Sequence, residues 1–237
     1  KRGGNLKQLN NGLWLFTDVI FRSQDGLNWQ LYRDATGLDE GDYMYYDLTG
    51  MGSHLYLVQF DYYDATHRKV LRSDDNGASW NVVWQGSERP TLYPGTGNDR
   101  ILLGLHNLGV GTPAVGLKYS DDFGDSWQDI PGAANFLNVA SKGDSIYYYY
   151  NQKVYYTHNL GQQWQTTSLA TNFQYGGTVM VFPNGRVLLI NNSTYIGYVS
   201  LDGGQTFSEM FDLQNFGTQI DASRFVQFDS LLIAHGA

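Results

Sequence analysis

The sequence predicts an all-β protein built from repeated four-stranded antiparallel units. The first reason is a short motif that occurs five times, at residues 23–29, 73–80, 120–127, 157–164 and 200–207. The second is that short runs of alternating apolar and polar residues flank each copy, as expected of strands. No segment longer than a turn shows the apolar spacing of a helix. A motif that recurs every 37–50 residues therefore organises the whole chain.

The motif predicts a tight turn between two strands. The second copy reads SDDNGASW, the third SDDFGDSW, the fifth SLDGGQTF, the fourth THNLGQQW, and the shorter first copy SQDGLNW. A hydroxyl and a carboxylate two residues apart can bond the backbone of their own turn, and glycine supplies a left-handed conformation. We expect Asp75 and Asp122 to accept hydrogen bonds from backbone N–H groups of their own turns. We also expect Trp80 and Trp127 to be largely buried, since each begins the next strand as an apolar anchor.

Each motif belongs to a unit of four expected strands, which we name A, B, C and D, with the motif as the C–D turn. In the fourth unit these are residues 136–140, 145–150, 153–156 and 164–166. The other units contain residues 6–9, 13–16, 19–22 and 29–32; 43–48, 54–60, 69–72 and 80–84; 91–93, 101–106, 115–119 and 127–130; and 178–182, 187–191, 196–199 and 207–211. Residues 224–228 and 231–234 read as a further A and B.

Four-stranded units repeated around an axis make a β-propeller, in which each unit is a blade. We predict a single domain over residues 1–237 with five blades, closed by residues 224–228 lying beside the first blade. Six or seven blades are the alternative if the chain is a fragment. Its first residue is Lys1 rather than Met, so we expect it to be processed or part of a longer protein.

The motif resembles the Asp-box, or BNR, repeat, whose pattern is S-x-D-x-G-x-[TS]-[WF]. Copies two, three and five match every defined position, whereas copy four has Asn159 and Gln163, and copy one is a residue shorter. Because the resemblance extends along the whole chain, it implies an Asp-box β-propeller. It says little about activity, since the box is a structural turn in sialidases, lectin-like modules, sorting receptors and assembly factors. The early F-R-I-P segment of sialidases is missing, the nearest string being FRSQ at residues 21–24.

Composition excludes several classes of protein. The net charge of −8 and the absence of a Lys/Arg cluster argue against a nucleic-acid partner. The chain has no cysteine, which excludes disulfides, thiol nucleophiles and cysteine-based zinc sites. No run approaches the eighteen or so apolar residues of a membrane span, no signal peptide is visible, and no cofactor is predicted.

The D–A and B–C connections of a propeller share one side, which we call the loop face, and the repeated turns lie on the other. The longer connections belong to blades two and three, at residues 33–42, 61–68, 86–90 and 107–114. Ligand sites are usually carried by such loops. The predicted ligand-binding set combines aromatic and hydrogen-bonding residues of these loops, namely Tyr62, Tyr63, Asp64, His67, Arg68, Glu88, Arg89 and Asp42. His67, His106 and Asp64 lack the spacing of a metal site, so none is predicted.

These observations predict a non-catalytic recognition module that binds a glycan or a protein through its loop face. We expect it to be secreted, on a cell surface or associated with a virion. One alternative is a glycoside hydrolase that uses a pair of loop carboxylates, for which the candidates are Asp39, Glu40, Asp42, Asp64 and Glu88. A second alternative is a structural repeat domain within a larger assembly.

Overall fold

The computed structural model describes residues 5–9, 12–16, 20–31, 44–61, 63–95, 100–108, 114–169, 173, 176–212, 225–228 and 231–234. In these residues the regular structure is β-strand apart from one short 3-10 helix. The chain divides into two compact units. The first comprises Lys1–Pro94, Asp99–Thr112 and Lys118–Gln128, and the second Gly95–Asn98, Pro113–Leu117 and Asp129–Ala237.

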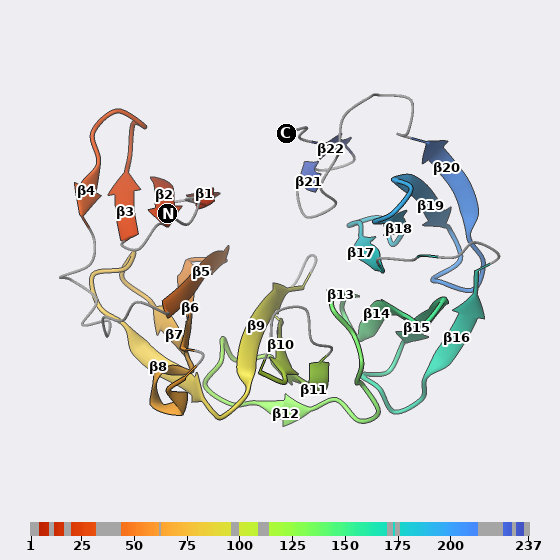
Figure 1. Cartoon of the computed structure of the whole chain (residues 1–237), viewed down its shortest axis with the longest axis horizontal. Coiled ribbons are helices and arrows are strands. Elements are labelled where there is room, and N and C mark those ends of the chain that lie inside the picture. The colour runs from red at the N-terminus through yellow and green to blue at the C-terminus, as the bar shows by residue number, and fades with distance from the viewer. Residues whose placement is uncertain are drawn as a thin grey trace. The chain divides into compact units, whose positions relative to one another are not determined.

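Five four-stranded sheets follow one another along the chain, and in each the strands lie side by side in sequence order (Figure 1). Blade one contains β1 (Asn5–Leu9), β2 (Gly12–Phe16), β3 (Ile20–Ser23) and β4 (Gln30–Leu31). Blade two contains β5 (Met44–Met51), β6 (His54–Asp61), β7 (Lys69–Ser73) and β8 (Asn81–Gln85), with the 3-10 helix η1 (Ala65–His67) between β6 and β7. Blade three contains β9 (Arg89–Pro94), β10 (Ile101–His106), β11 (Ala114–Ser120) and β12 (Gln128–Asp129).

The same order continues in the second half of the sequence. Blade four contains β13 (Val139–Lys142), β14 (Ser145–Tyr150), β15 (Lys153–Thr157) and β16 (Gln165–Ser168). Blade five contains β17 (Gly177–Val181), β18 (Val187–Asn191), β19 (Ile196–Ser200) and β20 (Ser208–Asp212). The antiparallel four-stranded units predicted from the sequence are therefore confirmed.

One predicted strand begins later than expected. The A strand of blade four starts at Val139, whereas the apolar pattern placed its start at residue 136. The carbonyl of Phe136 instead accepts a hydrogen bond from the N–H of Ala114 at 2.8 Å, and Asn135 donates back to the Ala114 carbonyl at 2.7 Å. Residues 135 and 136 are thus bonded to the start of β11, and Phe136 is buried without belonging to a strand of its own sheet.

The last two strands are β21 (Phe225–Phe228) and β22 (Leu231–Ala234), which pair with each other in a two-stranded antiparallel sheet. The predicted hairpin is confirmed. The pairing of this hairpin with the first blade stays a prediction.

The second unit contains a core made largely by blades four and five. Along β14, Tyr147 and Tyr149 lie in one buried cluster with Val179 and Leu189 of blade five. Tyr148, between them in sequence, belongs to the opposite side of the sheet, where its ring stacks on that of Tyr155 at 4.9 Å. Alternation along a strand therefore places successive tyrosines on opposite faces of blade four.

The first unit contains a corresponding core. Its buried cluster joins Tyr56, Val58 and Val70 of blade two to Leu92 and Leu103 of blade three. Tyr56 is fully buried, and its hydroxyl donates to the carbonyl of Phe123 at 3.1 Å. A polar end on a buried aromatic residue thus finds a partner in the adjacent blade.

We number the repeated turns one to five in sequence order, and turns two, three and five share one hydrogen-bond pattern. In turn two, the Ser73 hydroxyl donates to Asp75 at 2.8 Å and accepts from the N–H of Gly77 at 2.6 Å. The same carboxylate oxygen of Asp75 accepts from the N–H of Ser79, and the second oxygen accepts from the Ser79 hydroxyl. Turns three and five repeat these four bonds, so the expectation for Asp75 and Asp122 is confirmed.

The expectation that Trp80 and Trp127 are largely buried holds in part, because both side chains are partly buried and neither is exposed. The indole N–H needs an acceptor, and both side chains meet that need at the edge of the core. Trp127 donates to the carbonyl of Val83 in the preceding blade at 2.9 Å, and Trp80 to that of Gly77 in its own turn at 3.1 Å. The ring of Trp127 also packs against the buried cluster of the first unit.

Candidate functional site

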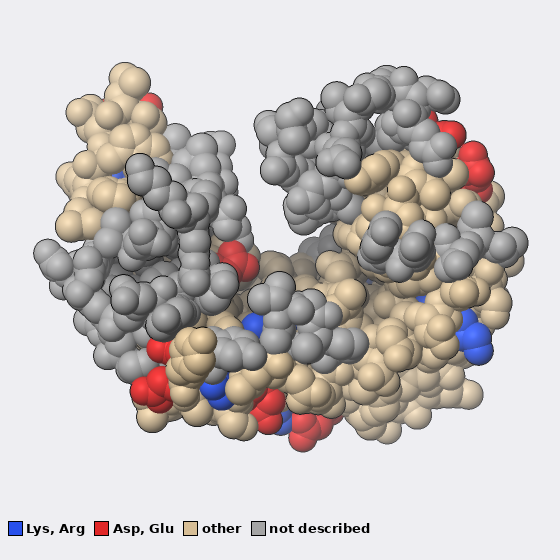
Figure 2. All heavy atoms as spheres, in the orientation of Figure 1, with Lys and Arg blue, Asp and Glu red and all other residues tan. Residues whose placement is uncertain are grey.

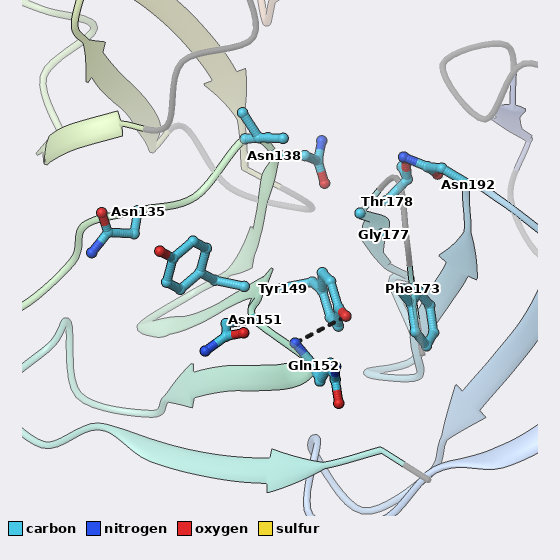
Figure 3. A pocket seen from close by; sticks show the side chains of 12 residues that line it. Asn135, Asn138, Tyr149, Asn151, Gln152, Phe173, Gly177, Thr178 and Asn192 are labelled. Carbon is cyan, nitrogen blue, oxygen red and sulfur yellow. Dashed lines mark hydrogen bonds between the residues drawn. The ribbon is translucent and has the colours of Figure 1, made fainter. Parts of the chain in front are cut away.

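A pocket of about 410 Å³ opens on the loop face of the second unit. Its walls are the connection that leads into β13, the β14–β15 turn, the connection that leads into β17 and the β18–β19 turn. Figure 3 shows Asn151 and Gln152 on one side of the pocket and Phe173, Thr178 and Asn192 on another. All of these segments lie in blades four and five or directly before them.

The floor of the pocket is aromatic. The rings of Tyr149 and Phe173 are 4.7 Å apart and tilted by 35°, and their residues are only 7% and 5% exposed. Gly177 allows this packing because a Cβ there would lie 3.2 Å from both rings and 2.9 Å from Leu189 Cδ1. The first residue of β17 is thus small because the floor rings lie against its backbone.

The β14–β15 turn is a two-residue hairpin in an uncommon conformation. Asn151 and Gln152 have φ angles of 47° and 63°, the left-handed values that this type of turn requires at both positions. Left-handed backbone is unfavourable for a side chain such as that of glutamine. The N–H of Gln152 donates to the Tyr149 hydroxyl at 3.0 Å, and Leu169 donates to the Gln152 carbonyl at 3.2 Å. The floor tyrosine therefore holds the turn that forms the rim.

Burial raises the pKa of Tyr149, and hydrogen bonds from the backbone oppose the rise. A phenol already titrates well above neutral pH, so the Tyr149 hydroxyl stays protonated under ordinary conditions. It therefore serves as a neutral hydrogen-bonding group in the pocket wall.

Two asparagine side chains in the pocket are oriented by hydrogen bonds that their side-chain oxygens accept. Asn138 Oδ1 accepts from the N–H of Val179 at 2.9 Å, and Asn192 Oδ1 accepts from the Thr178 hydroxyl at 3.1 Å. The N–H of Asn192 also donates to the Gly176 carbonyl at 3.1 Å. With the oxygens engaged, each NH₂ group supplies two donors that no described residue uses.

The remaining lining residues extend the same chemistry. Asn135 has a left-handed φ of 65°, Tyr150 is 38% exposed, and Leu137 is also largely exposed. Among the described residues that line the pocket, none carries a carboxylate, an amine or an imidazole. The pocket can therefore stack and hydrogen-bond a neutral group, but its described lining offers no acid or base for proton transfer.

In the predicted ligand-binding loop of blade two, the described aspartates accept hydrogen bonds from the loop's own backbone. Tyr62 and Asp42 lie outside the described residues, as do Asp39 and Glu40 and the side chain of His67. Tyr63 is 72% exposed, and its N–H donates to Asp61 Oδ1 at 2.7 Å. Asp64 caps η1 by accepting from the N–H and the hydroxyl of Thr66 at 2.8 and 2.7 Å.

Arg68 connects two of the predicted loops. It is only 5% exposed, its Nε donates to the Asp61 carbonyl at 2.9 Å, and its Nη1 donates to the Ser87 carbonyl. Its guanidinium carbon also lies 5.7 Å from the centre of the Phe60 ring. The N–H of Gly86 donates in turn to the Arg68 carbonyl at 3.3 Å. The structure therefore brings the 61–68 loop beside the segment that precedes Glu88 and Arg89, both partly exposed. The ligand-binding role of this set stays a prediction.

Sequence reasoning did not select the pocket of blades four and five, because the connections there are short. The available signal was the Asn-Gln pair at residues 151–152, placed between two strand-like runs where a left-handed turn is needed. Further asparagines precede β13 and follow β18. Their convergence on one pocket depends on the pairing of strands far apart in sequence.

Surface charge and metal-ligand geometry add two observations. On the face shown in Figure 2, the Lys and Arg atoms of the described residues are scattered rather than gathered into a patch. No three His, Asp or Glu side chains of the described residues gather as metal ligands do. Separately, the described residues contain no helix that is long and apolar enough to cross a bilayer.

No protein-family model and no curated protein matches this chain. Solved structures do match. One described as YCF48 bound to D1 peptide is 14% identical with a TM-score of 0.65, and the match covers 95% of this chain and 73% of that one. Virginiamycin B lyase from Staphylococcus aureus, a catalytically inactive H270A variant with quinupristin, is 10% identical with a TM-score of 0.66 over 98% and 76% of the two chains. An ancestral GH74 enzyme is 15% identical with a TM-score of 0.57, over 88% of this chain and 31% of that one. With the five four-stranded sheets, these similarities show that the chain has the fold of a β-propeller.

Proposed function

We propose that the chain is an Asp-box β-propeller that acts as a non-catalytic recognition module and binds a glycan or a protein on its loop face. The observation that carries this proposal is the pocket of blades four and five, which combines an aromatic floor with an amide rim. Pockets that pair apolar surface with a few oriented polar groups are typical of binding sites. The hydrogen-bond pattern that turns two, three and five share supports the Asp-box assignment, because the first hydroxyl, the aspartate, the glycine and the second hydroxyl of the motif all take part in it.

Binding is favoured over hydrolysis by the chemistry of the described lining. A glycoside hydrolase needs two carboxyl groups about 5–10 Å apart across the bond that it cleaves. The pocket lining described above contains amides, hydroxyls and aromatic rings instead. Of the loop carboxylates considered for hydrolysis, Asp64 uses an oxygen to hold the η1 turn. The neighbour that is bound to D1 peptide supports a protein partner for a propeller of this architecture.

A pair of glutamines in blade four tests the proposal. Gln152 borders the pocket, and Gln162 is exposed in turn four at the opposite end of the same sheet. The purified chain is applied to glycan and peptide arrays, and the strongest hit is titrated with Gln152→Ala and Gln162→Ala. We expect Gln152→Ala to weaken binding and Gln162→Ala to leave it unchanged. Binding lost only with Gln162→Ala would place the site at the repeated turns and overturn the proposal.

A second variant separates the pocket from the loop of blade two. Tyr62→Ala combined with Tyr63→Ala removes the aromatic residues of that loop without touching the pocket. If this double variant abolishes binding while Gln152→Ala does not, the loop face is still the binding face, but the site lies in blade two.

A further inference from the structure

Two asparagine side chains of the pocket share a feature that restricts the class of ligand that can bind. Asn138 and Asn192 each have the oxygen held within the protein, by Val179 and Thr178 respectively, so the orientation of the NH₂ group follows from the fold. A planar amide held in this way presents donors in a fixed direction. Fixed donors lose little conformational entropy on binding, which favours small polar ligands that match them.

Uncharged lining residues indicate a neutral ligand. Neither an arginine nor a lysine is present among the described lining residues, so a carboxylate or sulfate group would lose its hydration without gaining an ionic partner. The net charge of −8 also opposes the approach of an anion.

The size and the walls of the pocket favour a ring-shaped ligand over an extended chain. Its volume of about 410 Å³ lies near the lower end of the roughly 300–1,000 Å³ found for small-ligand sites. Two connections and two turns form its walls, and the partly exposed Tyr150 is one of its lining residues. A sugar ring has an apolar face that packs on an aromatic ring and hydroxyls around its edge that accept from amide NH₂ groups.

From these observations we infer that the pocket binds one or two uncharged sugar rings of a glycan. This inference rests on the proposed recognition function and assigns a ligand class to the pocket. Tyr150 supplies the exposed aromatic surface, and Asn138 and Asn192 donate to ring hydroxyls. Gln152 and Asn151, held in the left-handed turn by the Tyr149 hydroxyl, border the same space.

Asparagine-to-aspartate substitutions provide a matched test. Asn138→Asp keeps the oxygen that accepts from Val179 but replaces the NH₂ donors with a second oxygen. Asn184 is exposed at the β17–β18 turn, and its Oδ1 likewise accepts from a backbone N–H, that of Arg186 at 3.1 Å. Asn184→Asp therefore controls for the added charge and for the change in an asparagine that bonds the backbone.

The probes are glucose, galactose, mannose, N-acetylglucosamine and lactose, with N-acetylneuraminic acid as the anionic comparison, each measured by saturation-transfer NMR with the full chain. We expect at least one neutral sugar to bind and N-acetylneuraminic acid to give no signal. Asn138→Asp should lower the affinity for the neutral sugar about tenfold or more. Asn184→Asp should bind as the parent chain does. Circular dichroism and unfolding midpoints establish that both variants are folded.

The other outcomes overturn the inference in distinguishable ways. Sugar binding that survives Asn138→Asp places the sugar elsewhere and leaves the recognition function in place. Peptide binding without sugar binding, lost in Asn138→Asp, gives the pocket a protein ligand and again leaves that function in place. If the arrays yield neither glycans nor peptides, both this inference and the proposed function are wrong.

Discussion

The two ends of each blade differ in how uniform their connections are. The repeated turns form the uniform end, and the B–C connections belong to the variable end. At one end, turns two, three and five have the same four hydrogen bonds between a serine, an aspartate, a glycine and a second hydroxyl residue. At the other end, the B–C connection contains a capped 3-10 helix in blade two and a two-residue left-handed hairpin in blade four. Uniform chemistry at the first end maintains the repeat, whereas the variable end is where one blade can acquire a site that the others lack.

The largest expected effect concerns the uniform end. A Cβ at Gly161 in turn four would lie 2.6 Å from Ile130 Cγ2 and 2.8 Å from the Pro131 carbonyl oxygen, and its φ is 80°. Gly161→Ala should therefore lower the free energy of unfolding by about 3 kcal/mol, through overpacking and left-handed strain together. Urea denaturation measures the change.

Gly185 provides the matched control, because its φ is 86° but a Cβ there would meet only Lys142 Nζ, at 3.8 Å. Gly185→Ala should cost about 1 kcal/mol, the strain alone. Equal losses at the two sites would show that close packing between blades is unimportant at turn four.

The next effect concerns the connection in blade two. Arg68→Ala removes a buried guanidinium that donates to the carbonyls of Asp61 and Ser87. The free energy of unfolding should fall by about 2–3 kcal/mol, as expected when hydrogen bonds from a charged group are lost and their acceptors stay buried. Arg68→Lys, which keeps the charge but lacks the planar guanidinium group, should recover part of the lost stability. An unchanged unfolding midpoint in Arg68→Ala would instead favour a role confined to ligand binding.

A smaller effect of opposite sign is expected in blade four. Gln152→Gly should raise the free energy of unfolding by about 1 kcal/mol, because glycine adopts a φ of 63° without steric cost. Gln162→Gly, outside the left-handed region, should lower it by about 0.5–1 kcal/mol through added chain entropy. Thermal unfolding of the two variants gives the signs. Stabilisation of Gln152→Gly together with loss of ligand binding would show that the strain is retained for function.

The smallest expected effect is a loss of stability at low pH, which arises in the repeated turns. Hydrogen bonds from the hydroxyl residue four positions later lower the pKa of Asp75, Asp122 and Asp202 to about 2. An unfolded aspartate titrates near pH 3.9, so these turns add stability above about pH 4 and lose it as pH falls towards 2. Asp122→Asn should make stability less sensitive to pH in that range. Urea midpoints between pH 2 and pH 5 measure the slope, and an unchanged slope would contradict a stabilising role for the carboxylate.

The sequence was sufficient for the repeated turns and the strands, because the information for both is local. Ser73, Asp75 and Gly77 act on one another within five residues, and the same pattern recurs in the other turns. The pocket was not predictable in this way. Asn138 gains its orientation from Val179, a residue that only sheet packing brings near. The length, aromatic residues and charged residues of the blade-two loop predict a ligand site there, and that role stays a prediction. The sequence did not indicate that Arg68 donates to the carbonyls of Asp61 and Ser87, or that Asp64 accepts from the N–H of Thr66.

The tryptophan of a repeated turn has a consequence for synthesis of the chain. Trp127 donates to Val83, 44 residues earlier, and Trp164 to Pro131, 33 residues earlier. Each of these bonds reaches back by about one repeat, so a blade leaving the ribosome can be fastened to its predecessor before the next has been translated. Folding from the N-terminus, one blade at a time, is therefore expected to limit the exposure of unpaired strand edges while the protein is being made.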